Sequence, residues 1–501
     1  MQTAVDSASF YHGIGVNARP VSKFTPVLRV LGGLTLVFAG AMATPLLFHF
    51  NPMSPSGAAF VFSVAATGFA GLVMLTLSPS RGEFSLTRRQ GFLITTLAWT
   101  VLPAFGAMPL VEEGLSVADA YFEAVSAMTT TGATVMSGLD ETPHAILVWR
   151  SMMQWVGGVG IIVVGIIMMP FLRVGGMQLF QTESSDTSEK IVTKAFDLVA
   201  WILGIYITLT FAATVLYTAF GMSWFDALNH AMTSVSTGGF STHDASFGYF
   251  QQPALHWTGS FFMLCGALPF IAFIRLAKGN IGAFVGDIQI RAFLGFLAAA
   301  SFTIAATLVL REGMPVMEAA RYSTFNVISI VTTTGYATTD YQQWGAFAFG
   351  AFFILTFVGG CSGSTSGGVK IYRFQILRSL VMVHLSRMIS PSRINVVMYH
   401  DRRVDADVAF AIMAFLAIML FSLVISTSLL AWLGVDLLTA LTASATSITN
   451  VGPGLGDVVG PAGNFSTLPD AAKWVLAFMM IVGRLEYFTV FVLLVPAFWR
   501  G

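Results

Sequence analysis

The chain has 501 residues, of which 55% are hydrophobic and only 10% are charged, and its mean hydropathy is +0.76. A soluble domain carries about 25% charged residues, so this composition leaves too little charge to cover a surface that faces water. It predicts an all-α integral membrane protein. The formal net charge of zero gives no support for nucleic-acid binding. Cys265 and Cys361 offer neither a disulfide framework nor a metal-ligand spacing.

Residues 1–85 form the first of five predicted regions, an N-terminal arm followed by a two-helix extension. The polar arm, up to about residue 25, lacks the small-residue cleavage site of a signal peptide, so we expect it to lie in the cytoplasm. Apolar stretches at about 28–50 and 57–79 are each long enough to cross a bilayer about 30 Å thick.

The remaining four regions each predict two spanning helices with a re-entrant loop between them, an M1–P–M2 unit. Their boundaries are 86–180, 181–285, 286–404 and 405–501, and their paired spans lie at about 91–111 with 146–172, 197–221 with 254–277, 291–311 with 345–372, and 407–433 with 472–498. Between the members of each pair lies an amphipathic stretch that is too short to span. We therefore expect it to enter the membrane and return.

Each short stretch ends in a hydroxyl-rich segment and a glycine, and these glycines are about 100 residues apart. Four such loops around one axis would supply the carbonyl oxygens that replace water around a potassium ion, and preceding threonines can add hydroxyl ligands. Glycine permits the backbone angles and the close approach that such a ring needs. The predicted filter residues are Thr130, Thr131, Gly132, Thr237, Gly238, Thr334, Gly335, Asn450, Val451 and Gly452.

One such segment is a weak signal, because glycine and threonine are common in transmembrane helices. Four of them in the same frame form a strong one. The alternative is that the glycines only allow helices to pack closely.

Charge asymmetry orients the predicted helices. Basic residues gather near 23–29, 81–89, 173–194, 275–291 and 370–403, which places these segments in the cytoplasm by the positive-inside rule. The opposite side carries the acidic residues Glu112, Glu113, Asp119, Asp140, Asp244, Asp340 and Asp457. We expect the filter to open on this outer side, where acids raise the local cation concentration. Ordinary solvated loop acids are an equally good interpretation of any one of them.

A glycine-rich loop interrupts the second predicted span of the third unit. It comprises Gly359, Gly360, Cys361, Ser362, Gly363, Ser364, Thr365, Ser366, Gly367 and Gly368, with Lys370 just after it. Five glycines in ten residues do not continue a helix comfortably, and irregular backbone at membrane depth is tolerated only inside protein or beside a wet cavity. We predict a flexible flap across the cavity. A phosphate-binding loop is the competing interpretation, but the spacing does not fit it.

The last predicted span contains two charges, Arg484 and Glu486. A buried arginine normally faces a polar interior or a partner, and here it would place a positive charge in the pore wall. A structural ion pair is the alternative. Residues two apart do not share a helix face, so we expect at least one of the two to pair elsewhere.

With these residues in hand, the chain resembles the Trk-type bacterial potassium uptake subunits, the TrkH/TrkG/TrkI branch of the Trk/Ktr/HKT superfamily. The resemblance covers nearly the whole chain. Its most specific stretches are TTTGAT at 129–134, WVGGVGIIV at 155–163, STGGFSTH at 236–243, TTTGYATTDY at 332–341, GGCSGSTSGGVKIYR at 359–373, TNVGPGLG at 449–456 and GRLEYFT at 483–489.

The resemblance implies four covalently linked units around one pore, two such chains in a homodimer, and filter glycines at Gly132, Gly238, Gly335 and Gly452. A serine at the first glycine accompanies sodium permeation in this superfamily, so four glycines favour potassium as the transported ion. The fourth loop departs from the pattern at Asn450 and Val451. The family gate corresponds to Gly359–Gly368 with Lys370, and the pore arginine to Arg484.

The resemblance also implies a cytosolic ring of regulatory RCK-domain subunits. The chain has no dinucleotide-binding fingerprint and no implied organic cofactor of its own, so NAD or ATP/ADP would act through that partner. The basic segment Arg373–Arg403 is a candidate contact for the ring or for acidic membrane lipids.

The predicted function is potassium uptake across the bacterial cytoplasmic (inner) membrane by a multi-pass protein with a cytoplasmic N-terminus. The alternative is a secondary transporter coupled to protons or sodium, for which Glu486 is the plausible buried carboxylate. An enzyme is not expected, because His230, His243 and His256 are scattered along the loops and form no catalytic motif.

Overall fold

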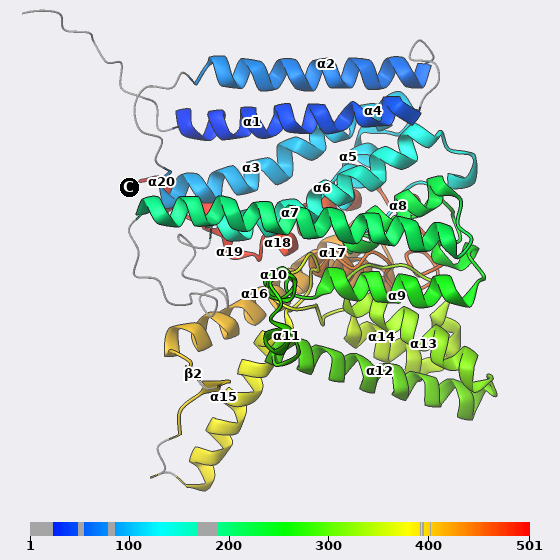
Figure 1. Cartoon of the computed structure of the whole chain (residues 1–501), viewed down its shortest axis with the longest axis vertical. Coiled ribbons are helices and arrows are strands. Elements are labelled where there is room, and N and C mark those ends of the chain that lie inside the picture. Colours follow the sequence, from blue (N-terminus) through cyan, green and yellow to red (C-terminus); the bar gives the residue numbers. More distant parts are fainter. Residues whose placement is uncertain are drawn as a thin grey trace, which may run out of the picture.

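The computed structural model describes residues 24–48, 55–78, 86–168, 188–390, 392, 395–400 and 402–500. Its long helices run roughly parallel to one another in a single bundle (Figure 1). Within the described residues, seven helices are long and apolar enough to cross a membrane, and two bent helix pairs raise that number to nine. The predicted all-α membrane fold is confirmed. The polar arm before residue 24 and the basic turn at 79–85 lie outside the described residues.

Two helices at the edge of the bundle precede the repeated part. They are α1 (Thr25–Met42), continued by the short η1 (Thr44–Phe48), and α2 (Pro55–Thr76). They lie side by side at the top of Figure 1, where a Cβ at Gly32 would stand 3.0 Å from the carbonyl oxygen of Gly71. The two glycines therefore bring these helix backbones into close contact.

The order of a long helix, a short helix, an extended segment and a second helix then occurs four times. The first occurrence contains α3 (Arg88–Gly106), α4 (Met108–Glu112), α5 (Val117–Met128), η2 (Leu139–Glu141) and α6 (His144–Met168). The second contains α7 (Ser188–Ala219), α8 (Trp224–Val235), η4 (Ser246–Tyr249), α9 (Pro253–Ala267), α10 (Phe270–Ala277) and α11 (Ile281–Val285).

The third occurrence contains α12 (Ile288–Glu312), α13 (Val316–Val331), η5 (Tyr341–Trp344), α14 (Gly345–Leu355), α15 (Ile371–Ile389) and a hairpin of β1 (Met398–Tyr399) and β2 (Arg402–Arg403). The fourth contains α16 (Ala406–Trp432), α17 (Leu437–Thr449), α18 (Asp470–Arg484), α19 (Phe488–Phe491), η6 (Val492–Leu494) and α20 (Pro496–Trp499). We refer to these four groups as repeats 1 to 4.

Three predicted spans are not continuous helices. The stretch 254–277 bends by 98° between α9 and α10, and 472–498 bends by 106° between α18 and α19. The stretch 345–372 is a helix only up to Leu355, and helix resumes at Ile371. Apolar composition alone predicted single spans here. Pro269 at the first break, the positive φ of Glu486 and Tyr487 at the second, and the glycine-rich loop at the third interrupt the helical backbone.

The short helices α5, α8 and α17 begin at side chains that cap them. Ser116 accepts a hydrogen bond from the backbone N–H of Asp119, Ser223 does the same for Asp226, and Asp436 for Thr439. These caps satisfy N–H groups that have no partner within the helix. The opposite, carbonyl ends of the short helices lead into the centre of the bundle, where their dipoles favour a cation.

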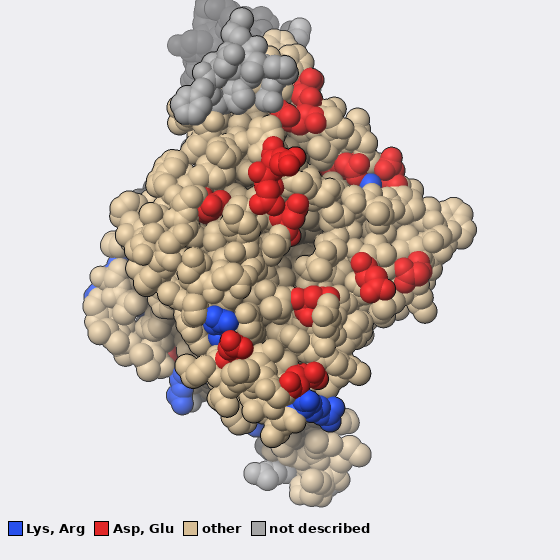
Figure 2. All heavy atoms as spheres, turned by 90° about the vertical axis from the view of Figure 1, so that its right-hand side faces the viewer, with Lys and Arg blue, Asp and Glu red and all other residues tan. Residues whose placement is uncertain are grey.

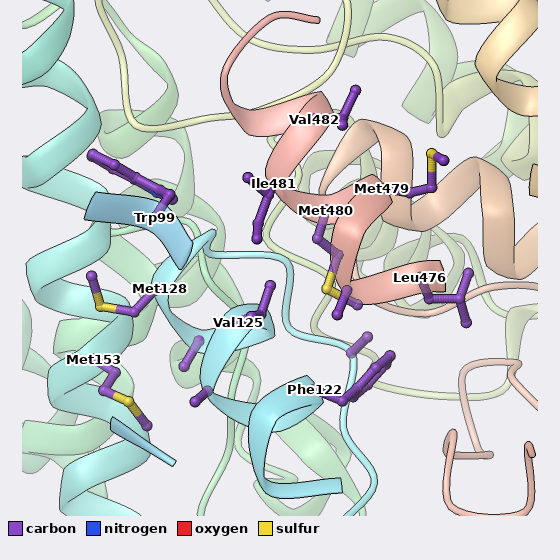
Figure 3. Close-up of a cluster of buried hydrophobic side chains, with 14 of the residues drawn as sticks. Trp99, Phe122, Val125, Met128, Met153, Leu476, Met479, Met480, Ile481 and Val482 are labelled. Carbon is purple, nitrogen blue, oxygen red and sulfur yellow. The ribbon is translucent and has the colours of Figure 1, made fainter. Parts of the chain in front are cut away.

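Close packing brings these helix ends to the second helix of the same repeat. A Cβ at Gly157 of α6 would collide with the carbonyl oxygen of Met128, the last residue of α5. Gly266 of α9 and Gly483 of α18 meet the carbonyl oxygens of Val235 and Ile448 in the same way. Figure 3 shows the apolar core around α5, where Val125 and Met128 gather with side chains of α3, α6 and α18.

Candidate functional site: a ring of four glycines

The backbone leaves the four short helices in one repeated conformation. At each helix end a backbone N–H donates to the carbonyl five residues earlier, at 2.8 to 3.1 Å. The four bonds run from Thr131 to Ser126, from Gly238 to Thr233, from Thr334 to Ser329 and from Val451 to Thr446. The residue before each donor has a left-handed φ of 51–58°, namely Thr130, Thr237, Thr333 and Asn450. Left-handed backbone is uncommon for residues other than glycine, so four occurrences at the same place mark one shared structure.

This register places Gly239 with Gly132, Gly335 and Gly452, in the position that the sequence assigned to Gly238. Gly132, Gly239, Gly335 and Gly452 follow the hydrogen-bond donors directly and have φ values of 83°, 79°, 83° and 109°. Gly238 itself takes the place of Thr131, Thr334 and Val451. The sequence does carry a signal for this register: an aromatic residue follows both Gly335 and Gly239, as Tyr336 and Phe240, whereas Gly238 is followed by a glycine.

The four glycines form a closed ring, which we call the glycine ring. A Cβ at Gly132 would collide with the carbonyl oxygen of Gly238, one at Gly239 with that of Thr334, and one at Gly335 with that of Val451. A Cβ at Gly452 would stand 2.7 Å from the carbonyl oxygen of Thr131, which closes the circle. Each repeat therefore packs its glycine against the backbone of the next, in the order 1, 2, 3, 4, 1.

Beyond the ring, each extended segment is tied back to its own short helix. The residue nine positions before the ring glycine holds the segment in three repeats. The Glu123 carboxylate accepts from the Thr134 hydroxyl and the Val135 N–H, both at 2.9 Å. His230 lies 3.0 Å from the Ser241 hydroxyl, and the Asn326 amide donates to the Thr338 hydroxyl at 2.7 Å. Repeat 4 has Ala443 there, and the neighbouring Thr442 donates to the carbonyl of Leu455 at 2.7 Å.

Most predicted threonine ligands use their hydroxyls within the framework. The Thr131 hydroxyl bonds to that of Thr129 at 2.7 Å, and the Thr334 hydroxyl to that of Thr332 at 2.8 Å. Asn450 donates to the Thr131 hydroxyl at 3.0 Å and to the carbonyl of Met480 at 2.9 Å, which joins repeat 4 to repeat 1. The Thr130 hydroxyl has no hydrogen-bond partner among the described residues, and the carbonyl of Gly238 accepts from the Gln154 amide at 2.6 Å.

One end of the bundle opens onto the ring through an acidic vestibule. A cavity of about 560 Å³ is lined by all four ring glycines and by Asp244 and Asp457. Figure 2 looks at this end of the molecule and shows acidic side chains distributed around a hollow, with few basic ones. The predicted segregation of acids at the filter end is therefore present in the structure, and the negative potential it creates favours cations.

His243 links the outer loops of repeats 1 and 2 at the vestibule. Its ring stacks on Tyr249 with centroids 3.5 Å apart, its Nδ1 bonds to Asp140, and its Nε2 lies 3.4 Å from Asp226. Burial disfavours the imidazolium, but the hydrogen bonds and charges of Asp226 and Asp140 outweigh it and raise the pKa of His243. The hydrogen bond from His243 lowers the pKa of Asp140.

The glycine-rich loop Gly359–Gly368 lies directly against the other side of the ring segments. The Thr365 hydroxyl bonds to that of Thr237 in repeat 2 at 3.2 Å, and Gly367 N–H donates to the Thr333 hydroxyl in repeat 3 at 2.6 Å. Gly368 N–H donates to the carbonyl of Thr449 in repeat 4 at 2.8 Å. The loop thus joins three repeats beneath the ring.

Hydrogen bonds within the loop and to the residues just after it fix its conformation. Gly359 N–H donates to the carbonyl of Val369 at 2.9 Å, and Gly360 N–H donates to the Ser366 hydroxyl at the same distance. The Lys370 ammonium donates to the carbonyl of Ser366. Most of the loop is buried in this conformation, and several of its backbone N–H groups donate hydrogen bonds.

The two charged residues of the last predicted span, Arg484 and Glu486, do not pair with each other, as expected for residues two apart. Glu486 pairs with Arg373 at 2.6 Å, and the Arg373 guanidinium also lies 3.8 Å from the Phe415 ring centroid. Arg484 is the last residue of α18 and is 4% exposed. Among the described residues, its Nε and Nη2 have no hydrogen-bond partner. Arg373 is 2% exposed, so it cannot belong to a basic surface that contacts a partner, contrary to the expectation for Arg373–Arg403.

Comparison with known proteins agrees with this geometry. Residues 60–500 match the TrkH family, described as cation transport protein. The chain is 46% identical over 484 residues to the Trk system potassium uptake protein TrkI of Halomonas elongata, covering 95% of this chain and 97% of that protein. It is 34% identical over 489 residues to the Trk system potassium uptake protein TrkH of Escherichia coli K12, covering 95% and 99%.

The fold has also been seen in a solved structure. The crystal structure of the potassium transporter TrkH from Vibrio parahaemolyticus superposes with a TM-score of 0.87 at 34% identity, covering 95% of this chain and 100% of that one. A family match over most of the sequence and full-length relatives above 30% identity lead to one conclusion. This chain belongs to the TrkH family of cation transport proteins.

Proposed function

We propose that this chain takes up potassium across the cytoplasmic membrane through a single pore whose ion-selective site is the glycine ring. The observation that carries the proposal is the ring itself, in which four backbone segments from four repeats meet around one axis. Carbonyl oxygens arranged in this way replace the hydration shell of a dehydrated cation. The names of the relatives, which are potassium uptake proteins, support potassium as that cation.

The acidic vestibule supports an outer mouth at the end shown in Figure 2. Cations would gather there, lose water at the ring and meet the glycine-rich loop on the inner side. The N-terminus would then lie in the cytoplasm, together with α15 and the β1–β2 hairpin, which project from the opposite end of the bundle (Figure 1). Orientation by basic cytoplasmic segments supports the same assignment.

In this proposal the glycine-rich loop is the gate. Its position against three ring segments supports a closed state, and its many glycines allow another backbone conformation without side-chain clashes. Opening has to exchange the hydrogen bonds of Thr365, Gly367 and Gly368 for others, so the closed state is stable without an external signal. Lys370, bonded to Ser366, and the buried Arg484 would add positive charge to the closed path.

The signal would come from cytosolic nucleotide-binding subunits that contact α15. This helix projects from the body of the molecule, and large apolar side chains on it are exposed, namely Val381, Met382, Leu385, Met388 and Ile389. An apolar face outside the bundle supports a protein partner, either the regulatory ring or a second copy of the chain in a homodimer. Met388→Glu would separate the two, because dimer mass and co-purification of the ring are measured independently.

The alternative of proton- or sodium-coupled transport needs an available carboxylate along the path. Glu486 is engaged with Arg373 in the closed structure, so a proton relay through it would first have to break this pair. No observation favours coupling over conduction. Uptake driven by an imposed voltage, without a proton or sodium gradient, distinguishes passive conduction from coupled transport.

The test is rubidium and potassium uptake into liposomes that contain the chain, alone and with its regulatory subunits, compared with Gly132→Ser and Gly239→Ser variants. We expect voltage-driven uptake with a lower preference for potassium over sodium in both variants. Uptake that appears only with a proton or sodium gradient would refute passive conduction. Unchanged selectivity in both variants would refute the ring as the ion-selective site.

A further inference from the structure

A buried ion pair stands directly behind the glycine ring, in repeat 1. Glu123 lies in the middle of α5 and Arg150 in the first half of α6, and their side chains are 0% and 1% exposed. Arg150 Nε donates to Glu123 Oε1 at 2.8 Å. Two formal charges removed from water in this way persist only when their remaining hydrogen-bonding groups are also satisfied.

Those remaining groups are satisfied by the extended segment that leaves the ring. The Glu123 carboxylate accepts from the Thr134 hydroxyl at 2.9 Å and from the Val135 N–H at 2.9 Å. Arg150 Nη2 donates to the same Thr134 hydroxyl at 3.1 Å. Thr134 is two residues beyond Gly132, so the pair determines where the outer end of this segment lies.

Arg150 also reaches the neighbouring repeat. Its Nη1 donates to the carbonyl of Ser241 at 3.3 Å, and its guanidinium carbon lies 4.1 Å from the Phe240 ring centroid. Phe240 and Ser241 directly follow the ring glycine Gly239. One guanidinium thus contacts the outer segments of repeats 1 and 2, and the planar fork of arginine fixes their separation.

The other repeats lack this charged device. Arg150 lies seven residues before Gly157, and the corresponding positions before Gly266 and Gly483 are Gly259 and Leu476. The short-helix position of Glu123 is occupied by His230, Asn326 and Ala443. An ion pair is not needed to anchor such a segment, so its presence in one repeat calls for a role beyond anchoring.

We propose that Glu123 and Arg150 are positioning residues that set the spacing of the ring segments of repeats 1 and 2, and thereby the discrimination between potassium and sodium. The inference rests on the proposed function of the ring as the ion-selective site. Potassium and sodium differ in radius, so the balance between them depends on how firmly the surrounding oxygens are held. Charge-assisted hydrogen bonds are the shorter and stronger ones, which makes this pair a stiff support.

The experiment measures potassium and sodium uptake by the full chain with its regulatory subunits, as the ratio of the two maximal rates. The variants are Glu123→Gln, Arg150→Lys and the double variant Glu123→Gln with Arg150→Met, which avoids a lone buried charge if a single variant does not fold. We expect the potassium-to-sodium ratio to fall by about tenfold, since small displacements of a binding group change rates by such factors. Arg150→Lys should keep more of the wild-type ratio than the other variants, because lysine keeps the positive charge and loses only the planar guanidinium.

The matched control is a second ion pair on the same helix. Lys473 of α18 is 4% exposed and lies 2.5 Å from Asp119 in the first turn of α5. Asp119→Asn with Lys473→Met should lower the thermal unfolding midpoint and leave the ratio unchanged. If the potassium-to-sodium ratio falls equally in this control, Glu123 and Arg150 only stabilise α5 and have no specific positioning role.

Failure of the two proposals gives different results. If Gly132→Ser lowers the ratio while every folded Glu123 and Arg150 variant keeps the wild-type ratio, the positioning role is wrong and the ring remains the selective site. If Gly132→Ser and Gly239→Ser also keep the wild-type ratio, the ring itself is not the selective site.

Discussion

Repeats 1 and 4 build the same part of the glycine ring with different supports. In repeat 1 a buried ion pair holds the segment beyond Gly132. In repeat 4 Ala443 offers no polar group, and the segment beyond Gly452 is held by neutral hydrogen bonds, from the Thr442 hydroxyl to the carbonyl of Leu455 and from Gly456 N–H to the Gln342 side chain. Both ring glycines still pack against the carbonyl of the neighbouring repeat, with φ values of 83° and 109°. The backbone contact that closes the ring is therefore common to both repeats, while the side chains behind it differ and can take on separate tasks, such as the spacing role proposed for Glu123 and Arg150.

The largest effect should come from alanine at the ring glycines, and it should be equal in the two repeats. Gly132→Ala and Gly452→Ala each place a Cβ against a backbone carbonyl and force a positive φ on alanine. We expect each variant to lose potassium uptake by about a hundredfold or more, since backbone has to shift in the ring. Uptake by potassium-starved cells, normalised to the amount of protein in the membrane, measures this. An unequal loss would show that the side-chain supports decide how well each ring glycine tolerates a Cβ atom.

The second effect should differ between repeats 1 and 4. Glu123→Ala leaves Arg150 buried without its partner, which costs about 3–5 kcal/mol. Thr442→Val removes one neutral hydrogen bond to Leu455, which costs about 1 kcal/mol. Thermal unfolding midpoints of the purified variants in one detergent should rank in this order. Similar midpoints would mean that the ion pair is no stronger a support than the hydroxyl.

The third prediction concerns the loop beneath the ring, which bonds to repeats 2, 3 and 4. Thr365→Val removes hydrogen bonds to Thr237 and to the carbonyls of Val235 and Gly266 and keeps the side-chain volume. We expect uptake without the regulatory subunits to rise several-fold, because about 1 kcal/mol of closed-state stability corresponds to roughly a fivefold change in population. Thr356→Val, in the same chain segment but outside the loop, is the control. Equal uptake by both variants would argue against the loop as the gate.

The smallest effect should be seen with pH. The raised pKa of His243 means that its pairing with Asp226 and Asp140 contributes stability below the unfolded pKa of about 6.5 and loses it as pH rises through the folded pKa. The thermal unfolding midpoint should therefore fall slightly at alkaline pH, and His243→Gln should remove that slope. The effect should stay below about 1 kcal/mol, because half of the Asp140 side chain is exposed and screened. A steeper slope in His243→Gln would contradict this assignment.

Much of the fold follows from the sequence alone, because its physical causes are local. Long apolar stretches predicted the membrane helices, and the hydroxyl-rich segments ending in glycine predicted four equivalent loops. The same local view failed at 254–277 and 472–498, where the composition is apolar throughout but the backbone turns sharply. Apolar composition reports the surroundings of a segment and not its direction.

The sequence predicted the four segments that meet in the glycine ring but not their register. Counting to the first glycine after the hydroxyl residues selected Gly238, whereas the helix-closing hydrogen bonds and the positive φ values select Gly239. The partner of Glu486 was also out of reach, because Arg373 lies 113 residues away in the chain. Arg150 lies inside the predicted span 146–172, where an arginine needs a polar partner, but nothing local in the sequence pairs it with Glu123, 27 residues away.

The sequence by itself determined that this protein is a membrane-embedded helical bundle with four similar loops, because hydropathy and glycine spacing act along the chain. Only the tertiary structure decided which glycines close the ring, which charges pair and what lies beneath the ring. These features depend on backbone and side chains that meet across repeats about 100 residues apart, and contacts over such distances leave no trace in local composition.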